Sequence, residues 1–210
     1  GVRFQWLTNA TINGSVANDN GYKGIGLENS TNVLMTDCET SRNDFRQYWT
    51  GPLSLGNDCG GIKIIPNNRQ ITLSRFRALN NLNAISVWLD WNNTDITLEE
   101  CFIENPTENT VPLYIEASPG PVLVKKCTIR NSFSTVTLRG ASNVIFDSCQ
   151  FIDNNNRPSD GVFQIIRDGD ANIRTINGWK LTTAHVSITN CFIATDGNIF
   201  GIEPWNSPPA

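Results

Sequence analysis

Two carboxylates, Asp90 and Glu116, have the type and spacing that could support catalysis. They lie 26 residues apart, and each ends a short segment of alternating apolar and polar residues, Val87-Trp-Leu-Asp90 and Leu113-Tyr-Ile-Glu116. Strict alternation is typical of a β-strand with one buried face. If consecutive segments stack as parallel rungs, the carboxylates lie side by side outside, on backbones about 4.8 Å apart. Like charges opposite each other on neighbouring strands are destabilising, so a pair that tolerates this is a candidate catalytic pair.

A short apolar phrase recurs along the chain and predicts these rungs. Its copies end at one marker position, occupied by Cys38, Phe76, Cys101, Cys127, Cys149 and Cys191. We assign residues 2–7 to the same set, with Leu7 at the marker. A coil of this length cannot bury its apolar face alone and must stack on its neighbours. The sequence therefore resembles an all-β, right-handed parallel β-helix, a solenoid of about seven coils with three short strands each.

We expect one domain over residues 1–210, which is long enough for a sizeable core. Its opening residues look like part of a strand and do not form a signal peptide, so we expect a mature chain or a fragment of a longer solenoid. The longer intervals between copies predict insertions near 8–21, 40–60 and 153–184. A net charge of −4 without a basic stripe argues against nucleic acid as a partner. No apolar run approaches the roughly 20 residues of a membrane helix.

The marker position accepts cysteine, phenylalanine or leucine, which predicts an interior packing site. A free cysteine there behaves as a small apolar side chain, so we expect these cysteines to be buried and unpaired. No Cys-x-x-Cys spacing occurs, and we predict neither a metal site nor a cofactor. Cys59 lies apart from the repeat, and its partner is left open. The single histidine, His185, opens a copy of the phrase and is expected at the surface.

Aligning the first strand of each coil predicts two outward columns. One column runs through Glu28, Ile65, Asp90, Glu116 and Arg139, and the other through Gly26, Lys63, Trp88, Tyr114 and Thr137. Stacked Trp88 and Tyr114 would form an exposed aromatic platform that suits the apolar face of a sugar ring. Lys63 is expected to pair with Asp90 rather than with substrate. Arg139 favours an ionised Glu116, which is awkward for a general acid.

The insertion near 40–60 carries Phe45, Tyr48 and Trp49. An aromatic loop beside a rigid strand platform commonly closes a binding cleft, so we expect it to overhang the carboxylates. The alternative is that these aromatic residues only pack the loop against its own coil. The face on which the insertion near 153–184 lies is left open.

At this point the motifs resemble a known family. Val-Trp-Leu-Asp-Trp at 87–91 and Leu-Tyr-Ile-Glu-Ala-Ser-Pro-Gly-Pro at 113–121 are similar to the active-site coils of glycoside hydrolase family 120, β-xylosidases of the right-handed parallel β-helix repeat superfamily. The resemblance implies that Asp90 is the nucleophile and Glu116 the acid/base. It also implies a secreted, periplasmic or cell-surface location. The candidate substrate-binding residues are Trp88, Trp91, Tyr114, Lys63, Arg139, Trp49 and Tyr48.

We therefore expect a retaining glycosidase that acts on a xyloside-like plant or algal oligosaccharide or polysaccharide. Retaining enzymes hold their carboxyl groups about 5–5.5 Å apart, the distance that adjacent rungs supply. The alternative is a carbohydrate-binding or adhesive β-helix, such as a tail-spike or surface module, without catalysis. A second alternative is a polysaccharide lyase or epimerase, which needs a base near neutral pKa and a cationic clamp. A homo-oligomer, the sugar and the linkage are left open.

Overall fold

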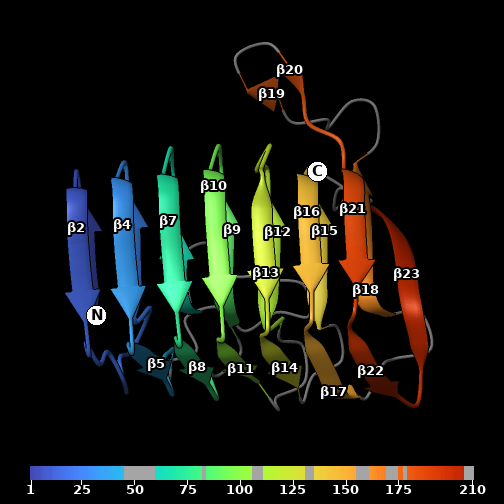
Figure 1. The fold of residues 1–210 in the computed structure, drawn as a ribbon, viewed down its shortest axis with the longest axis horizontal. Coiled ribbons are helices and arrows are strands. Elements are labelled where there is room, and N and C mark those ends of the chain that lie inside the picture. Colours follow the sequence, from blue (N-terminus) through green and yellow to red (C-terminus); the bar gives the residue numbers. More distant parts are fainter. Residues whose placement is uncertain are drawn as a thin grey trace.

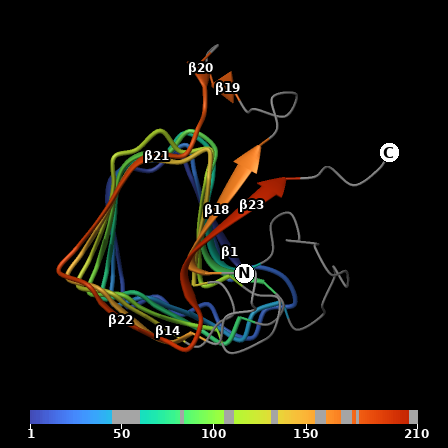
Figure 2. The same ribbon diagram turned by 90° about the vertical axis from the view of Figure 1, so that its right-hand side faces the viewer.

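The computed structural model describes residues 1–44, 60–81, 84–105, 111–130, 135–154, 161–168, 175–176 and 179–205. Every regular element in these ranges is a β-strand, and three parallel sheets run along one solenoid. Seen along the axis, the stacked coils enclose a common interior (Figure 2). The fold prediction is therefore confirmed in its strand content and its parallel stacking.

Sheet A carries the candidate site. In spatial order it contains β1 (Val2–Gln5), β3 (Ile25–Glu28), β6 (Gly60–Ile64), β9 (Ile85–Asp90), β12 (Leu113–Glu116), β15 (Val136–Arg139), β18 (Gly161–Asp168) and β23 (Asn198–Trp205). Each strand pairs in parallel with the strand one coil away, so sheet A runs the length of the solenoid (Figure 1).

Sheets B and C complete each coil. Sheet B contains β2 (Thr8–Asn13), β4 (Thr31–Thr36), β7 (Arg69–Ser74), β10 (Thr94–Glu99), β13 (Val122–Lys125), β16 (Ser142–Asp147) and β21 (Ala184–Thr189). Sheet C contains β5 (Glu39–Ser41), β8 (Arg77–Leu79), β11 (Phe102–Glu104), β14 (Thr128–Arg130), β17 (Gln150–Asn154) and β22 (Phe192–Thr195). The recurring phrase from Val33 to Val186 thus forms one continuous parallel sheet, as predicted.

The alternating pattern places one side of every sheet A strand in the core. Val87 and Leu89 of β9, Leu113 and Ile115 of β12, and Leu138 of β15 are completely buried. They join one apolar cluster that extends along the interior of the solenoid. Because burial of apolar surface is the main favourable term in folding, this column holds the coils in register.

The marker cysteines are interior and unpaired, as predicted. Cys38, Cys101, Cys127 and Cys149 are buried free thiols, and Cys191 is half-buried. The Cys127 thiol donates hydrogen bonds to carbonyl oxygens of its own coil and of the preceding coil. Contact with the cysteine one coil earlier, together with burial, raises the pKa of the Cys127 and Cys149 thiols.

The first coil differs from the prediction. Residues 2–7 contain β1 of sheet A, and the sheet B strand of this coil is β2 within the expected insertion 8–21. The Leu7 amide donates to Ser30 Oγ, so Leu7 lies at the corner after sheet A rather than at the marker position. The assignment was wrong because a short alternating strand of sheet A and one of sheet B look alike in sequence.

The expected insertion near 153–184 also contributes to the solenoid. It contains β18, which continues sheet A in register with β15. A short antiparallel pair, β19 (Thr175–Ile176) and β20 (Trp179–Lys180), follows β18 and lies outside the stack of coils (Figure 1).

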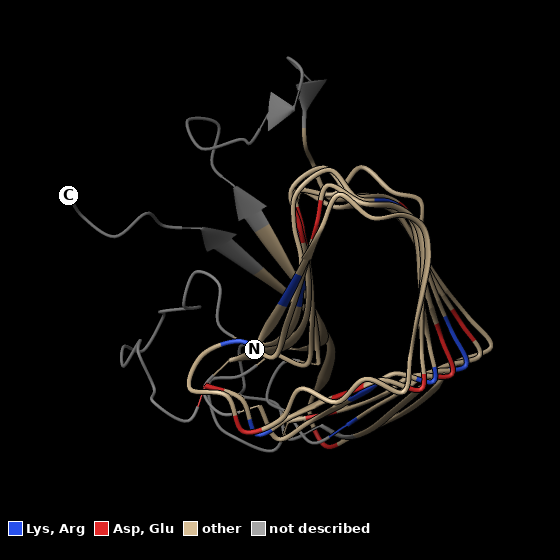
Figure 3. Cartoon of the chain, turned by 90° about the vertical axis from the view of Figure 1, so that its left-hand side faces the viewer, with Lys and Arg blue, Asp and Glu red and all other residues tan. Residues whose placement is uncertain are grey.

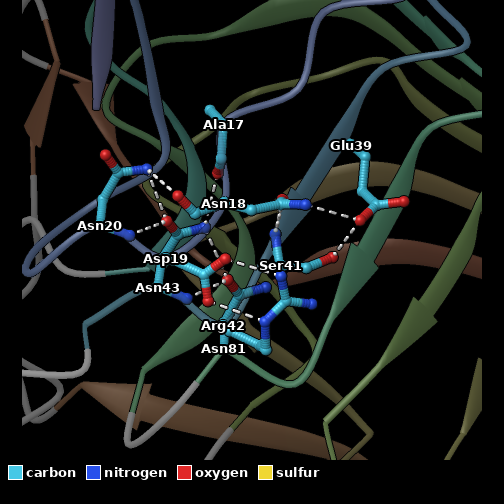
Figure 4. Close-up of polar contacts among 9 residues, drawn as sticks. All are labelled: Ala17, Asn18, Asp19, Asn20, Glu39, Ser41, Arg42, Asn43 and Asn81. Atoms are coloured by element: carbon cyan, nitrogen blue, oxygen red, sulfur yellow. Dashed lines mark hydrogen bonds and ion pairs between the residues drawn. The ribbon is translucent and has the colours of Figure 1, made fainter.

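Asparagine side chains hold the corners between sheets. The buried Asn43 amide donates to the Ala17 carbonyl and to Asn81 Oδ1, each at 3.0 Å, and Asn43 Oδ1 accepts from Asn20 (Figure 4). Beside them an exposed Arg42 forms two hydrogen bonds with the Asp19 carboxylate. The buried amides satisfy backbone groups that no strand pairs at a corner, which explains the asparagine-rich composition.

Charged residues lie in stacks along the outside. At the corner after sheet B, acidic and basic side chains of successive coils alternate (Figure 3). Arg75 pairs with Asp37 at 2.7 Å, and Lys125 pairs with Glu99 at 2.9 Å. Alternation avoids the repulsion that like charges in register would produce. Among the described residues no helix is long and apolar enough to cross a membrane.

Candidate active site

The two outward columns predicted from the sequence exist in the structure. Sheet A aligns Gly26 with Lys63, Lys63 with Trp88, Trp88 with Tyr114, and Tyr114 with Thr137. The second column aligns Asp90 with Glu116, and Glu116 with Arg139. The candidate carboxylates are therefore in-register neighbours on adjacent parallel strands, whose backbones lie about 4.8 Å apart.

The expectation that these columns form an exposed face was wrong. Asp90 is 7% exposed and Glu116 3% exposed, and Lys63, Trp88 and Tyr114 are buried as well. Trp88 and Tyr114 form a second apolar cluster with Ile85 and Val111, separate from the core of the solenoid. The alternating pattern shows which side chains point out of a coil, but it does not show what packs over them. Trp91, which follows β9, is 40% exposed.

Each carboxylate has a cationic partner on the side away from the other carboxylate. Lys63 Nζ lies 3.1 Å from Asp90 Oδ2, which confirms the expected pair. On the other side, Arg139 Nη1 lies 3.5 Å from Glu116 Oε1. We call these four buried residues the charge quartet. Its order along the solenoid is positive, negative, negative, positive, and its net charge is zero.

The quartet explains how two buried like charges remain side by side. Two unit charges 5 Å apart repel by about 3 kcal/mol at an effective dielectric constant of about 20. Each cation lies less than 5 Å from its own carboxylate. The attractions of Lys63 to Asp90 and of Arg139 to Glu116 therefore offset the repulsion between the two carboxylates. Removal of either cation would break the ion pair of a buried carboxylate, which is strongly destabilising.

Trp88 connects the two halves of the quartet. Lys63 Nζ lies 3.5 Å from the centroid of the Trp88 ring, and the indole Nε1–H donates to Glu116 Oε2 at 3.1 Å. Tyr114, in the next coil, stacks on Trp88 at 5.6 Å between ring centroids, with an angle of 21°. Both neighbours along the solenoid axis thus contact the indole ring. Contact of Trp88 or Tyr114 with a sugar remains a prediction.

The structure adds residues that the sequence interpretation had not selected. Asn93 is buried and its amide donates to the carbonyls of Asp90 and Ile64, each at 2.8 Å, which holds the corner where the Asp90 strand ends. The paired Asn-Asn after each of two outward strands, at 67–68 and 92–93, is the signal that could have found it. The column that contains Trp88 and Tyr114 continues beyond Thr137 to Gln164, whose Oε1 accepts a hydrogen bond from the Thr137 hydroxyl at 3.4 Å.

Glu28 occupies the carboxylate column at the other end but lies apart from the quartet. It accepts hydrogen bonds from Arg3 and Gln5 of the first coil. The Arg3 guanidinium holds the pKa of the Glu28 carboxyl below its usual value. Ile65 separates Glu28 from Asp90 in the column.

Two predicted binding residues, Tyr48 and Trp49, lie outside the described residues, as do Phe45 and Cys59. Among the residues that the structure describes, no group of three or more histidine, cysteine or acidic side chains could hold a metal ion. The described site therefore consists of two carboxylates, two cations and two aromatic rings. Such a set can support acid–base and nucleophilic chemistry, or it can bind an anionic sugar through its cations.

Solved structures with the same fold include three with strong overall similarity. The A-module of mannuronan C-5 epimerase AlgE4 from Azotobacter vinelandii aligns with a TM-score of 0.66 at 14% identity, over 96% of this chain and 57% of that one. The periplasmic alginate epimerase AlgG gives 0.62 at 12%, over 97% and 47%. XylC in complex with xylose gives 0.58 at 11%, over 96% and 39%. At these identities the likeness shows the fold alone.

The chain spans between 39% and 57% of the length of these three structures. No curated protein matches its sequence. A family model described as the right handed beta helix region matches residues 1–134, which is more than half of the chain. Together with the three stacked parallel sheets, this match shows that the chain belongs to the right-handed parallel β-helix family.

Proposed function

We propose that this chain carries the active site of a retaining glycosidase that acts on xyloside-like plant or algal oligosaccharides or polysaccharides. The observation that carries the proposal is the in-register pair of Asp90 and Glu116, each held by its own cation. Backbones one coil apart, about 4.8 Å, are close enough for the short carboxyl separation that retaining enzymes use. The motif around both residues, which resembles glycoside hydrolase family 120, assigns their roles. XylC, solved with xylose, shares the fold.

In the proposed reaction Asp90 attacks the anomeric carbon while the glycosidic C–O bond breaks. Glu116 gives its proton to the leaving oxygen, and a covalent glycosyl-enzyme remains. Glu116 then takes a proton from water, the water oxygen bonds to the anomeric carbon, and the bond to Asp90 breaks. Net retention follows from the two displacements.

Glu116 must carry a proton before the first step, and Arg139 opposes that proton. We therefore propose that Arg139 sets the upper pH limit of activity, since a nearby cation favours the carboxylate form. Arg139→Gln should move this limit to higher pH, because the acid then keeps its proton longer. Arg130→Gln, which removes a more exposed arginine–glutamate pair with Glu104 in sheet C, is the control and should leave the profile unchanged. An unchanged profile in both variants contradicts this role.

The first experiment is a screen of aryl-glycosides, with β-xyloside and α-arabinoside first, and with the anomeric configuration of the product followed by NMR. Because Asp90 is buried against Lys63, Asp90→Asn is a better test than Asp90→Ala: it keeps the shape and removes the nucleophile. This variant should lose turnover. Glu116→Ala should recover with azide, with retained configuration. Full activity in Asp90→Asn, or an inverted product, contradicts the proposal.

A second candidate is a polysaccharide lyase or epimerase. The observation that favours it is the presence of two buried cations, Lys63 and Arg139, which could bind a uronate carboxylate. Two structures with this fold are the mannuronan C-5 epimerase AlgE4 and the alginate epimerase AlgG. Incubation with alginate and polygalacturonate discriminates between the candidates, because a lyase yields an unsaturated, ultraviolet-absorbing product and an epimerase changes the uronate ratio. A non-catalytic carbohydrate-binding module would show binding without either reaction.

A carbohydrate-active β-helix acts where polysaccharides occur. We therefore propose a secreted, periplasmic or cell-surface location, in line with the periplasmic AlgG.

A further inference from the structure

A hollow of about 440 Å³ lies at the corner between sheets A and B, separate from the charge quartet. Three successive coils line it. Asn67 and Arg69 come from the first of these coils, Asn92, Thr94 and Asp95 from the second, and Gly120 and Pro121 from the third.

The third coil lines the hollow with Gly120 and Pro121 of the turn Pro119-Gly120-Pro121. Its corner has the same length as the one before it, six steps from Glu116 to Val122 and six from Asp90 to Ile96. The buried residue of this corner is Ser118, where the preceding coil has Asn93. Gly120 adopts a φ of +77°, in the left-handed region that favours glycine, and contributes no side chain to the wall.

Polar side chains with planar or hydroxyl groups line the other walls. The Asn92 amide donates to Asn67 Oδ1 at 2.8 Å, so the two amides form a row across the coils. Arg69 Nε lies 3.4 Å from Asp95 Oδ2, and Thr94 lies in register with Arg69 on the neighbouring strand. Exposed ion pairs of this kind are worth little, so their donors and acceptors can turn to a ligand at low cost.

The chemistry of the lining selects a class of ligand. One cation and one anion give the hollow no net charge, which disfavours a polyuronate. Amide, guanidinium, carboxylate and hydroxyl groups together can donate to and accept from neighbouring hydroxyls. The exposed Pro121 ring offers an apolar surface for the C–H face of a sugar.

We propose that this corner hollow is a second saccharide-binding site, specific for a neutral, hydroxyl-rich chain. Trp91 connects it to the charge quartet. It follows Asp90, precedes Asn92 and is partly exposed, and its carbonyl accepts a hydrogen bond from the Asn67 backbone N–H. The ligand class rests on the proposed function, whereas the binding does not depend on catalysis by Asp90.

The test measures binding in an inactive background. Asp90→Asn is titrated with xylohexaose and soluble arabinoxylan by calorimetry, and the measurement is repeated after adding Arg69→Ala with Thr94→Ala. The control adds Arg75→Ala, which removes another exposed, ion-paired arginine, directly after the other end of the same strand. Thermal melts check that all variants fold.

The variant with Arg69→Ala and Thr94→Ala, called the hollow variant, should bind xylohexaose at least about 10-fold more weakly than the background, as expected for the loss of several hydrogen bonds. The Arg75 control should bind as the background does. Equal affinity in hollow and control variants overturns the site, as does the absence of binding in the background. Binding of polygalacturonate as tight as that of xylohexaose overturns the neutral class. If the wild type hydrolyses no glycoside but binding still depends on Arg69 and Thr94, the proposed function fails and the site stands.

Discussion

Replacement of Lys63 by methionine is the most direct test of the charge quartet. The substitution keeps an unbranched side chain of similar length and removes the charge that lies 3.1 Å from Asp90. Asp90 then lies buried beside Glu116 without its ion pair to Lys63. Breaking a buried pair from one side typically costs about 3–5 kcal/mol of unfolding free energy. Loss of the cation–π contact with Trp88 adds about 0.5–2 kcal/mol.

A surface pair of the same kind supplies the matched control. Lys125 and Glu99 also join neighbouring coils, at 2.9 Å, but their side chains are 33% and 31% exposed. Exposed pairs contribute about 0.2–1 kcal/mol, so Lys125→Met should cost far less than Lys63→Met. Urea unfolding followed by circular dichroism measures both variants.

A further measurement separates the electrostatic part from packing. The double variant Lys63→Met with Asp90→Asn should recover much of the loss, because the carboxylate that Lys63 neutralises is then absent as well. A deficit of Lys63→Met no larger than that of Lys125→Met, or one that the double variant does not reduce, would refute the reasoning.

Three further expectations concern other parts of the solenoid. Arg3 is the chief cause of the depressed pKa of Glu28, so the Glu28 carboxylate stabilises the fold above the usual carboxyl pKa, and this stability is lost as the pH falls. The melting temperature of Glu28→Gln should therefore lie below that of the wild type at neutral pH, and the two should converge in acid. The raised pKa values of Cys127 and Cys149 keep both as buried thiols, so iodoacetamide should label them only after unfolding, as read by peptide mass spectrometry. Asn93→Ala removes the side-chain donor that two buried carbonyls share and should cost about 2–4 kcal/mol in urea unfolding; a loss below about 1 kcal/mol would contradict its corner role.

Much of the architecture follows from local pattern. Alternation in segments such as 87–90 and 113–116 predicts which side chains enter the core, and a repeat near 25 residues predicts which strands pair. The two outward columns then follow by alignment, and so does the pairing of Lys63 with Asp90. These features were predictable because register in a parallel solenoid depends on the apolar face of each coil.

The remaining features depend on contacts between distant segments. Burial of Trp88 and Tyr114 requires knowledge of what covers sheet A, to which Val111 contributes, and no strand period contains that information. The Trp88 indole hydrogen bond to Glu116 depends on a rotamer that packing selects. The corner hollow depends on how three neighbouring turns stack, the third of which is Pro119-Gly120-Pro121 where the earlier two carry Asn-Asn pairs.

The column that contains Asp90, Glu116 and Arg139 also shows that the fold does not require charges there. Ile65 and Ile166 flank these three residues in the same column, one coil before Asp90 and one coil after Arg139. Replacing buried ion pairs by apolar side chains is often neutral or stabilising, so isoleucine throughout would serve packing at least as well. Two adjacent buried carboxylates thus add a repulsion that the solenoid could avoid. Retaining such a cost at one place is typical of functional sites, where stability is lost in exchange for positioned charges. This contrast between Ile65 and Asp90 favours a catalytic interpretation of the pair over a purely structural one.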